Sequence, residues 1–214
     1  MTSRIVLLHG IATTASVWDR VVAALADLGI HDVVALERPC TGSLTAEIEA
    51  LAPHAEGALV VGQSGGATLA LALAASDRIS LAGALAHEPA VGSLLPGLLA
   101  PVAAAYAEGG LEGLGATLYG PSWSIAMAPP DHTRIPSELA MFRAFEPAAP
   151  PEHQGPVLVT VGERSPRIRH EAAAALHERL GYDTATLHGA AHFAAWDAPR
   201  AFAAAIARQH RSSA

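Results

Sequence analysis

The chain has 214 residues, of which 51% are hydrophobic and 15% charged, a composition that excludes a disordered chain and fits one domain spanning 1–214. Its net charge of −7 offers little to nucleic acid or an anionic membrane surface, so neither is predicted as a partner. The single cysteine, Cys40, excludes an internal disulfide, and residues 1–4 lack the features of a secretory signal, so a cytoplasmic location is expected.

Short apolar runs predict strands that are buried on both faces, and amphipathic stretches between them predict helices. Because strands and helices alternate almost throughout, we predict an α/β fold, with a parallel sheet of about six strands and helices on both faces. The expected strands are 5–8, 32–36, 58–61, 81–86, 157–161 and 184–187. Helices are expected over 17–28, from 45, and over 67–75, 172–180 and 199–208, with the acidic stretch 47–56 as a solvated helix face.

Residues 91–151 interrupt this alternation, because they contain many glycines and prolines and no strand pattern. An insertion of that size before the penultimate strand, on the ligand-binding side, predicts a helical cap over the site. Its aromatic and sulfur-containing side chains predict an apolar substrate pocket, although each could instead belong to the core of the cap. The candidate substrate-binding residues are Trp123, Met127, Met141, Phe142 and Phe145, and Tyr106 and Tyr119 belong to the same set.

The segment Gly62-Gln63-Ser64-Gly65-Gly66 lies between an expected strand and an expected helix. A serine on such a sharp turn stands clear of the sheet, and small neighbours allow the strand and helix backbones to approach closely. The following helix N-terminus would favour negative charge developing beside Ser64. We therefore predict a nucleophile elbow; the alternative is a glycine-rich turn whose serine only caps the helix.

A strand ending in His9-Gly10, the elbow at 62–66 and the late segment Gly189-Ala190-Ala191-His192 together resemble the α/β-hydrolase superfamily. The resemblance covers nearly the whole chain except the cap and implies that fold without its first two edge strands. It implies Ser64 as nucleophile and His192, in a small-residue loop after the last strand, as its base. The backbone N–H groups of Gly65 and Ile11 would be the oxyanion donors.

The position of the catalytic acid departs from the superfamily pattern. Ser165 stands where the superfamily usually has an aspartate after the penultimate strand. We favour Glu88, which follows the preceding strand and is stiffened by Pro89. Glu163 and a neutral Ser165 remain alternative partners of His192. Glu88 could otherwise pair with an arginine of the cap or with a helix N-terminus.

These residues predict a serine hydrolase that cleaves a carboxylic ester, thioester or lactone of a small, largely apolar substrate through an acyl-enzyme. One alternative is a lyase or cyclase that uses Ser64 and His192 for proton transfer, and another is a non-catalytic ligand-binding homologue. No Cys/His cluster has zinc spacing, so no metal or cofactor is predicted. The expected partner is a small-molecule substrate, and the oligomeric state stays open.

Overall fold

The computed structural model describes residues 3–213, which contain a six-stranded sheet with the order β2-β1-β3-β4-β5-β6. Every neighbouring pair is parallel, so the carboxyl ends of all the strands meet at one edge. This confirms the predicted parallel α/β sheet. The strands are β1 (Ile5–Leu8), β2 (Val33–Leu36), β3 (Leu59–Gln63), β4 (Gly83–His87), β5 (Val157–Gly162) and β6 (Asp183–Leu187).

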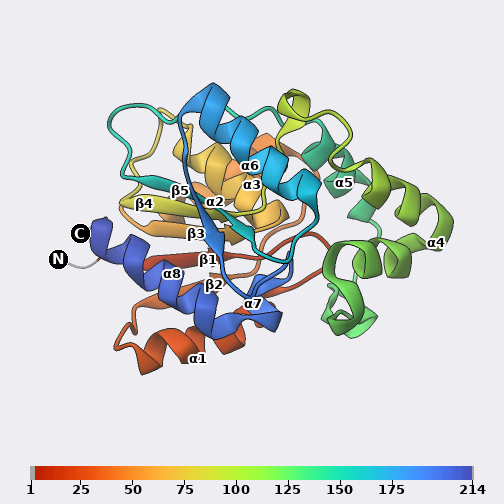
Figure 1. The fold of residues 1–214 in the computed structure, drawn as a ribbon, viewed down its shortest axis with the longest axis horizontal. Helices are drawn as coiled ribbons and strands as arrows, with labels where there is room; N and C mark the ends of the chain where they lie inside the picture. Colours follow the sequence, from red (N-terminus) through yellow and green to blue (C-terminus); the bar gives the residue numbers. More distant parts are fainter. Residues whose placement is uncertain (1–2, 214) are drawn as a thin grey trace.

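Helices cover both faces of the sheet (Figure 1). On one face lie α1 (Asp19–Asp27) and α8 (Pro199–Ser212), and on the other lie α2 (Leu44–Ala55), α3 (Gly65–Ala74) and α6 (Arg167–Leu180). The central strands are apolar on both sides because both sides are covered, and β1, β3 and β4 are buried along their whole length. Shorter turns of helix are α7 (Ala194–Asp197) and 3₁₀ segments at Ala15–Trp18, Gly92–Leu94, Gly120–Ser122 and Ile125–Met127.

The segment between β4 and β5 forms the helical insertion predicted before the penultimate strand. Its main helices are α4 (Ala100–Tyr119) and α5 (Ile135–Arg143), which lie beyond the carboxyl ends of the strands (Figure 1). Helix α4 is interrupted at Gly110, whose φ of 58° and ψ of −145° are not helical. This glycine allows the helix to change direction at the edge of the sheet.

Helix α2 corrects one expectation about the acidic stretch 47–56. Glu47 is fully buried instead of lying on a solvated face, because it forms an ion pair with the buried Arg38. Helix α6 also begins earlier than predicted, at Arg167. Glu47 is held inside the protein by a partner on another segment, whereas Arg167 is exposed and pairs with Glu171 of the same helix.

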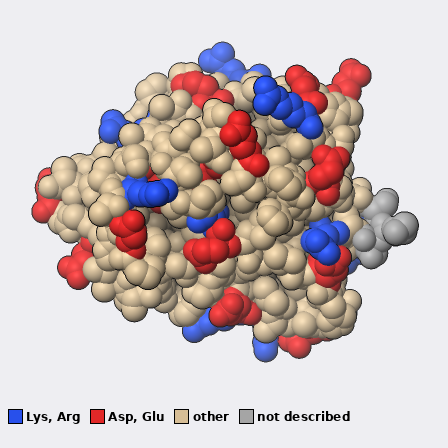
Figure 2. Space-filling view, turned by 180° about the vertical axis from the view of Figure 1, so that it is seen from behind, with Lys and Arg blue, Asp and Glu red and all other residues tan. Residues whose placement is uncertain are grey.

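The face of the molecule shown in Figure 2 carries no large patch of one charge among the described residues. On the face shown in Figure 2, acidic and basic side chains are interspersed over a mostly uncharged surface. None of the helices within residues 3–213 combines the length and apolar character needed to span a membrane. In the same range, no three His, Cys, Asp or Glu side chains are grouped so that they could hold a metal ion.

Candidate active site

The turn between β3 and α3 places Ser64 at the carboxyl edge of the sheet. Ser64 has a φ of 58° and a ψ of −122°, a backbone conformation that residues other than glycine rarely adopt. A side chain at Gly62 would collide with the Gly66 backbone, and one at Gly66 would collide with the Leu8 carbonyl. The small residues around Ser64 are therefore required by the close approach of strand and helix, as the sequence predicted.

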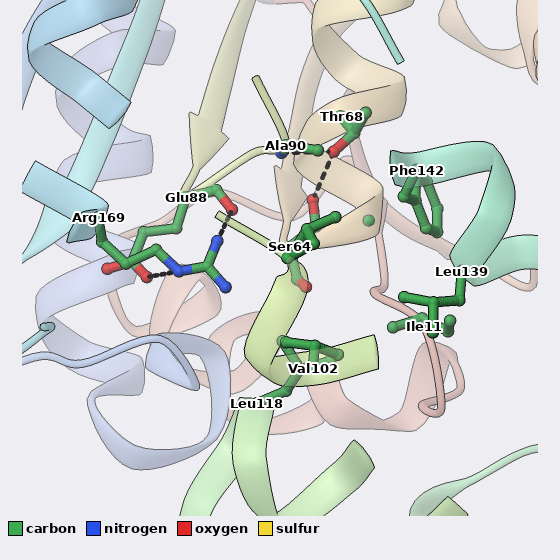
Figure 3. A pocket seen from close by; sticks show the side chains of 12 residues that line it. Ile11, Ser64, Thr68, Glu88, Ala90, Val102, Leu118, Leu139, Phe142 and Arg169 are labelled. Atoms are coloured by element: carbon green, nitrogen blue, oxygen red, sulfur yellow. Dashed lines mark hydrogen bonds and ion pairs between the residues drawn. The ribbon is translucent and has the colours of Figure 1, made fainter. Parts of the chain in front are cut away.

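Hydrogen bonds hold the backbone of Ser64 from both sides. Its N–H donates to the His87 carbonyl at 2.9 Å, and its carbonyl accepts from the Thr68 hydroxyl at 3.2 Å. The same Thr68 oxygen accepts from the Ala90 N–H at 2.9 Å, which ties α3 to the loop after β4 (Figure 3). Thr68 had no signal in the sequence, since it is one residue of an otherwise apolar helix.

Glu88 and His192 meet at this edge, although they are 104 residues apart. His192 Nδ1 lies 2.7 Å from Glu88 Oε2. The other carboxylate oxygen, Oε1, accepts from the Gly162 N–H at 2.9 Å and from the Ser165 hydroxyl. Glu88 has a φ of 52°, so the backbone turns sharply where the carboxylate is presented.

The electrostatics of the pair fix where the imidazole carries its proton. Burial alone would raise the pKa of Glu88, but the hydrogen bond and charge of His192, with the charges of His87 and Arg169, hold that pKa well below its usual range. Burial and the nearby Arg169 lower the pKa of His192 to about 4, against the opposing influence of Glu88. A neutral His192 whose Nδ1–H donates to Glu88 has a free electron pair on Nε2.

That Nε2 atom is buried and has no hydrogen-bond partner among residues 3–213. No hydrogen bond joins it to the Ser64 hydroxyl in this described range. Such contacts are often long in free enzymes and shorten only when the substrate binds. The neutral Nε2 of His192 is thus an available proton acceptor inside a water-poor site.

The two alternative acids take other positions. The Glu163 side chain is exposed and accepts from the Gly189 N–H at 2.8 Å, with His188 beside it. Ser165 donates its hydroxyl to Glu88 instead of His192. The structure therefore brings Glu88, Ser165 and His192 together and leaves Glu163 outside the cluster.

The backbone N–H groups of Ile11 and Gly65 belong to segments that face each other. Ile11 N lies 3.3 Å from the point that a Gly65 Cβ would occupy, and within residues 3–213 neither N–H donates a hydrogen bond. The Gly10 carbonyl accepts from the Thr13 hydroxyl at 2.9 Å and from Arg38 Nη2 at 3.3 Å. Because a trans peptide directs its carbonyl and N–H oppositely, these bonds orient the Ile11 N–H.

Arg38 also joins the body of the protein to the cap. This buried arginine pairs with Glu47 of α2 at 3.1 Å and with Glu138 of α5 at 2.7 Å. Sequence reasoning missed this cluster, because Glu138 lies 100 residues from Arg38 and no local pattern links them. The loop that carries Ile11 is consequently braced by a residue that also anchors α5.

The cap supplies further donors to the same loop. The Tyr119 hydroxyl donates to the Ile11 carbonyl at 2.7 Å, and Trp123 Nε1 donates to the Ala12 carbonyl at 2.9 Å. The Tyr119 ring also stacks on His192, with 5.7 Å between ring centroids. The sequence analysis assigned Tyr119 and Trp123 to an apolar substrate pocket. In the structure their polar atoms instead donate hydrogen bonds to the loop after β1.

A cavity beside Ser64 is bounded by the cap and the loop after β1. Of the five candidate substrate-binding residues only Phe142 lines it; Trp123, Met127, Met141 and Phe145 do not. The cavity leaves about 20 Å³ for the centres of water-sized molecules, which is room for about one water. The lining consists of Ile11, Ser64, Gly65, Thr68, Glu88, Ala90, Leu99, Val102, Leu118, Leu139, Phe142 and Arg169 (Figure 3).

Comparison with solved structures shows the same fold across the whole length of this chain. The enol-lactonase from Burkholderia xenovorans LB400 matches with 20% identity and a TM-score of 0.68, over 98% of this chain and 92% of that one. NosK from Streptomyces actuosus matches with 19% identity and a TM-score of 0.70, over 100% and 99% of the two chains. MenH from S. aureus matches with 14% identity and a TM-score of 0.72, over 100% and 95%.

Comparison of the sequence itself gives a family. No curated protein matches the chain in a sequence search. A family model described as the alpha/beta hydrolase family matches residues 5–205, from the first residue of β1 into α8. With that match over nearly the whole chain, and with the parallel sheet and the elbow already described, the protein belongs to the alpha/beta hydrolase family.

Proposed function

We propose that this hydrolase cleaves a carboxylic ester, thioester or lactone of a small substrate through an acyl-enzyme on Ser64. The observation that carries the proposal is the buried pair of His192 and Glu88, joined at 2.7 Å beside the strained serine turn. A serine hydroxyl is a weak nucleophile at neutral pH and needs such a base. Glu88 is the acid that we propose in place of the usual aspartate.

In this mechanism His192 Nε2 takes the proton of the Ser64 hydroxyl as its oxygen attacks the substrate carbonyl. The imidazolium that forms is stabilised by Glu88, which keeps Nδ1 protonated throughout. His192 then gives the proton to the leaving group, on the oxygen of an alcohol or the sulfur of a thiol. The acyl group remains bound to Ser64 as an acyl-enzyme. A water molecule, deprotonated by the same nitrogen, releases the acid and restores the serine.

The negative charge of each tetrahedral intermediate would be held by the N–H groups of Ile11 and Gly65. Both groups lie beside Ser64 without another acceptor among residues 3–213. Donors fixed in advance stabilise such charge because they need no reorientation during the reaction. Loss of one donor of this kind costs about 3 kcal/mol of transition-state stabilisation.

The test is the Ser64→Ala variant with p-nitrophenyl esters of two- to eight-carbon acids. We expect turnover to be abolished, and we expect acylated Ser64 in the wild-type protein by mass spectrometry after rapid quenching. Ser124→Ala, an exposed serine of the cap, is the matched control and should keep full activity. Wild-type turnover in Ser64→Ala would refute the assignment, and turnover without any acylated serine would favour lyase-type proton transfer.

A further inference from the structure

Arg169 is a charged side chain in the cavity that the proposed mechanism does not use. It is the only basic residue among the described residues that line the cavity, and most of the others are apolar. Its side chain is 10% exposed and extends from the first turn of α6 across the Glu88 carboxylate, with its end toward Ser64 (Figure 3). Nothing in the sequence pointed to it, because it looks like one arginine of a basic helix start.

Its position is not explained by the stability of the helix or by Glu88. A positive charge in the first turn of a helix is opposed by the helix dipole, and its burial carries a further cost. Glu88 compensates only in part, because Arg169 Nε lies 3.6 Å from Oε2 and Nη1 lies 3.5 Å from the Glu88 carbonyl. The carboxylate is held more closely by His192, Gly162 and Ser165.

The guanidinium therefore keeps bonding capacity in the cavity. No hydrogen bond from Arg169 Nη2 to a residue within 3–213 is formed. A planar guanidinium with free N–H groups matches a carboxylate, and such charge-assisted bonds are stronger than neutral ones. In a cavity that is otherwise mostly apolar, a substrate anion would have few competing partners.

We propose that Arg169 is an anion subsite and that the substrate carries a carboxylate near its scissile carbonyl. The inference rests on the proposed function and narrows its substrate class to carboxylate-bearing esters, thioesters or lactones with an apolar carbon skeleton. Because Ser64 and Arg169 line the same small cavity, we expect only a few bonds between the carboxylate and the scissile carbonyl.

The test compares matched esters with and without a carboxylate. In one pair the carboxylate is in the acyl part, mono-p-nitrophenyl adipate against p-nitrophenyl hexanoate; in the other it is in the alcohol part, 4-carboxyphenyl acetate against its methyl ester. For at least one pair we expect Arg169→Met to lower kcat/KM for the anionic ester about 10- to 100-fold more than for the neutral one. Arg169→Lys should retain part of the preference, and Arg167→Met, an exposed neighbour, should retain all of it.

A second measurement needs no variant, so a folding defect cannot obscure the result. Adipate should inhibit wild-type hydrolysis of p-nitrophenyl acetate with a Ki about tenfold or more below that of hexanoate. Equal losses for both members of each pair in Arg169→Met would make Arg169 a counter-ion of Glu88 and overturn the subsite. Equal inhibition by the two acids would also overturn it. Undiminished hydrolysis by Ser64→Ala would instead show that the proposed function itself had failed.

Discussion

Replacing Glu88 by glutamine changes one oxygen of the side chain to an NH₂ group and keeps its shape. Both oxygens of Glu88 are acceptors, Oε1 from the Gly162 N–H and the Ser165 hydroxyl, and Oε2 from His192 Nδ1. The Gly162 N–H is fixed in the backbone, so the amide oxygen must face it. The NH₂ group then faces His192 Nδ1. Because an NH₂ group is a donor, Nδ1 has to act as the acceptor.

The consequence is the wrong tautomer of His192. With Nδ1 as acceptor, the proton moves to Nε2, and the nitrogen that should deprotonate Ser64 becomes a donor. Loss of the carboxylate also removes the charge that stabilises the imidazolium. Amide replacement of the acid in a serine triad lowers kcat by about 10⁴, so we expect kcat to fall by about 10³ to 10⁴, or about 4 to 5 kcal/mol in the barrier.

The assay is steady-state hydrolysis of a p-nitrophenyl ester, with circular dichroism and thermal melting to verify folding. Glu163→Gln is the matched control, because this exposed carboxylate lies in the loop after β5 and, among residues 3–213, bonds only to the His188–Gly189 segment. Its kcat should change less than threefold. Ser165→Ala should lie between the two, since it removes one of the donors to Glu88. A Glu88→Gln kcat within tenfold of wild type, or an equal loss in Glu163→Gln, would refute this reasoning.

Three further outcomes are expected. Phe142 packs over Gly65, so Phe142→Ala should shift kcat/KM toward octanoyl over acetyl esters and lower the free energy of unfolding by about 3 kcal/mol; unchanged chain-length preference would contradict this. Tyr119→Phe leaves the Ile11 carbonyl without its donor and should cost about 1 to 3 kcal/mol of stability in urea titrations, with Tyr106→Phe, which is not fully buried, as the silent control. Burial lowers the pKa values of His9, His87 and His192. Below pH 6.5 the unfolded chain gains protons there that the folded chain does not, so stability should fall by up to about 1.4 kcal/mol per histidine per pH unit, and equal urea midpoints at pH 7.5 and 5.5 would exclude this.

Much of the fold could be predicted because its signals are local. Unbroken apolar runs such as Ile5–Leu8 are buried on both faces, and the Gly62–Gly66 segment matches a backbone approach that only small residues permit. The order of the three motifs along the chain indicated the resemblance to the α/β-hydrolase superfamily. The position of Glu88 after β4 followed from the apolar strand pattern before it, and the preference for Glu88 as the acid followed from the stiffness that Pro89 gives the turn; both are local properties.

What could not be predicted depends on long-range pairs of charges. Glu47 reads as a solvated residue of an acidic helix, and its burial follows only from Arg38 and, through it, from Glu138. Arg169 is similar, because its cavity position depends on how α6 packs against the loop after β4. Among the cap residues, composition indicated an apolar layer, but only the packing decides that Phe142 reaches the cavity while Trp123 binds a loop carbonyl.

The unusual backbone angles at Ser64 and Glu88 have a consequence for how the protein can change. Within residues 3–213 the non-glycine residues with positive φ are Ala12, Cys40, Ser64 and Glu88, and each follows one of the strands β1 to β4. Such conformations cost about 1 to 3 kcal/mol each. The folding free energy that the sheet supplies is thus partly spent at the rim where substrate would bind. Variants selected only for thermal resistance would tend to lose function first at these turns, whereas glycine at Cys40, which we assign no catalytic role, could relieve strain without that loss.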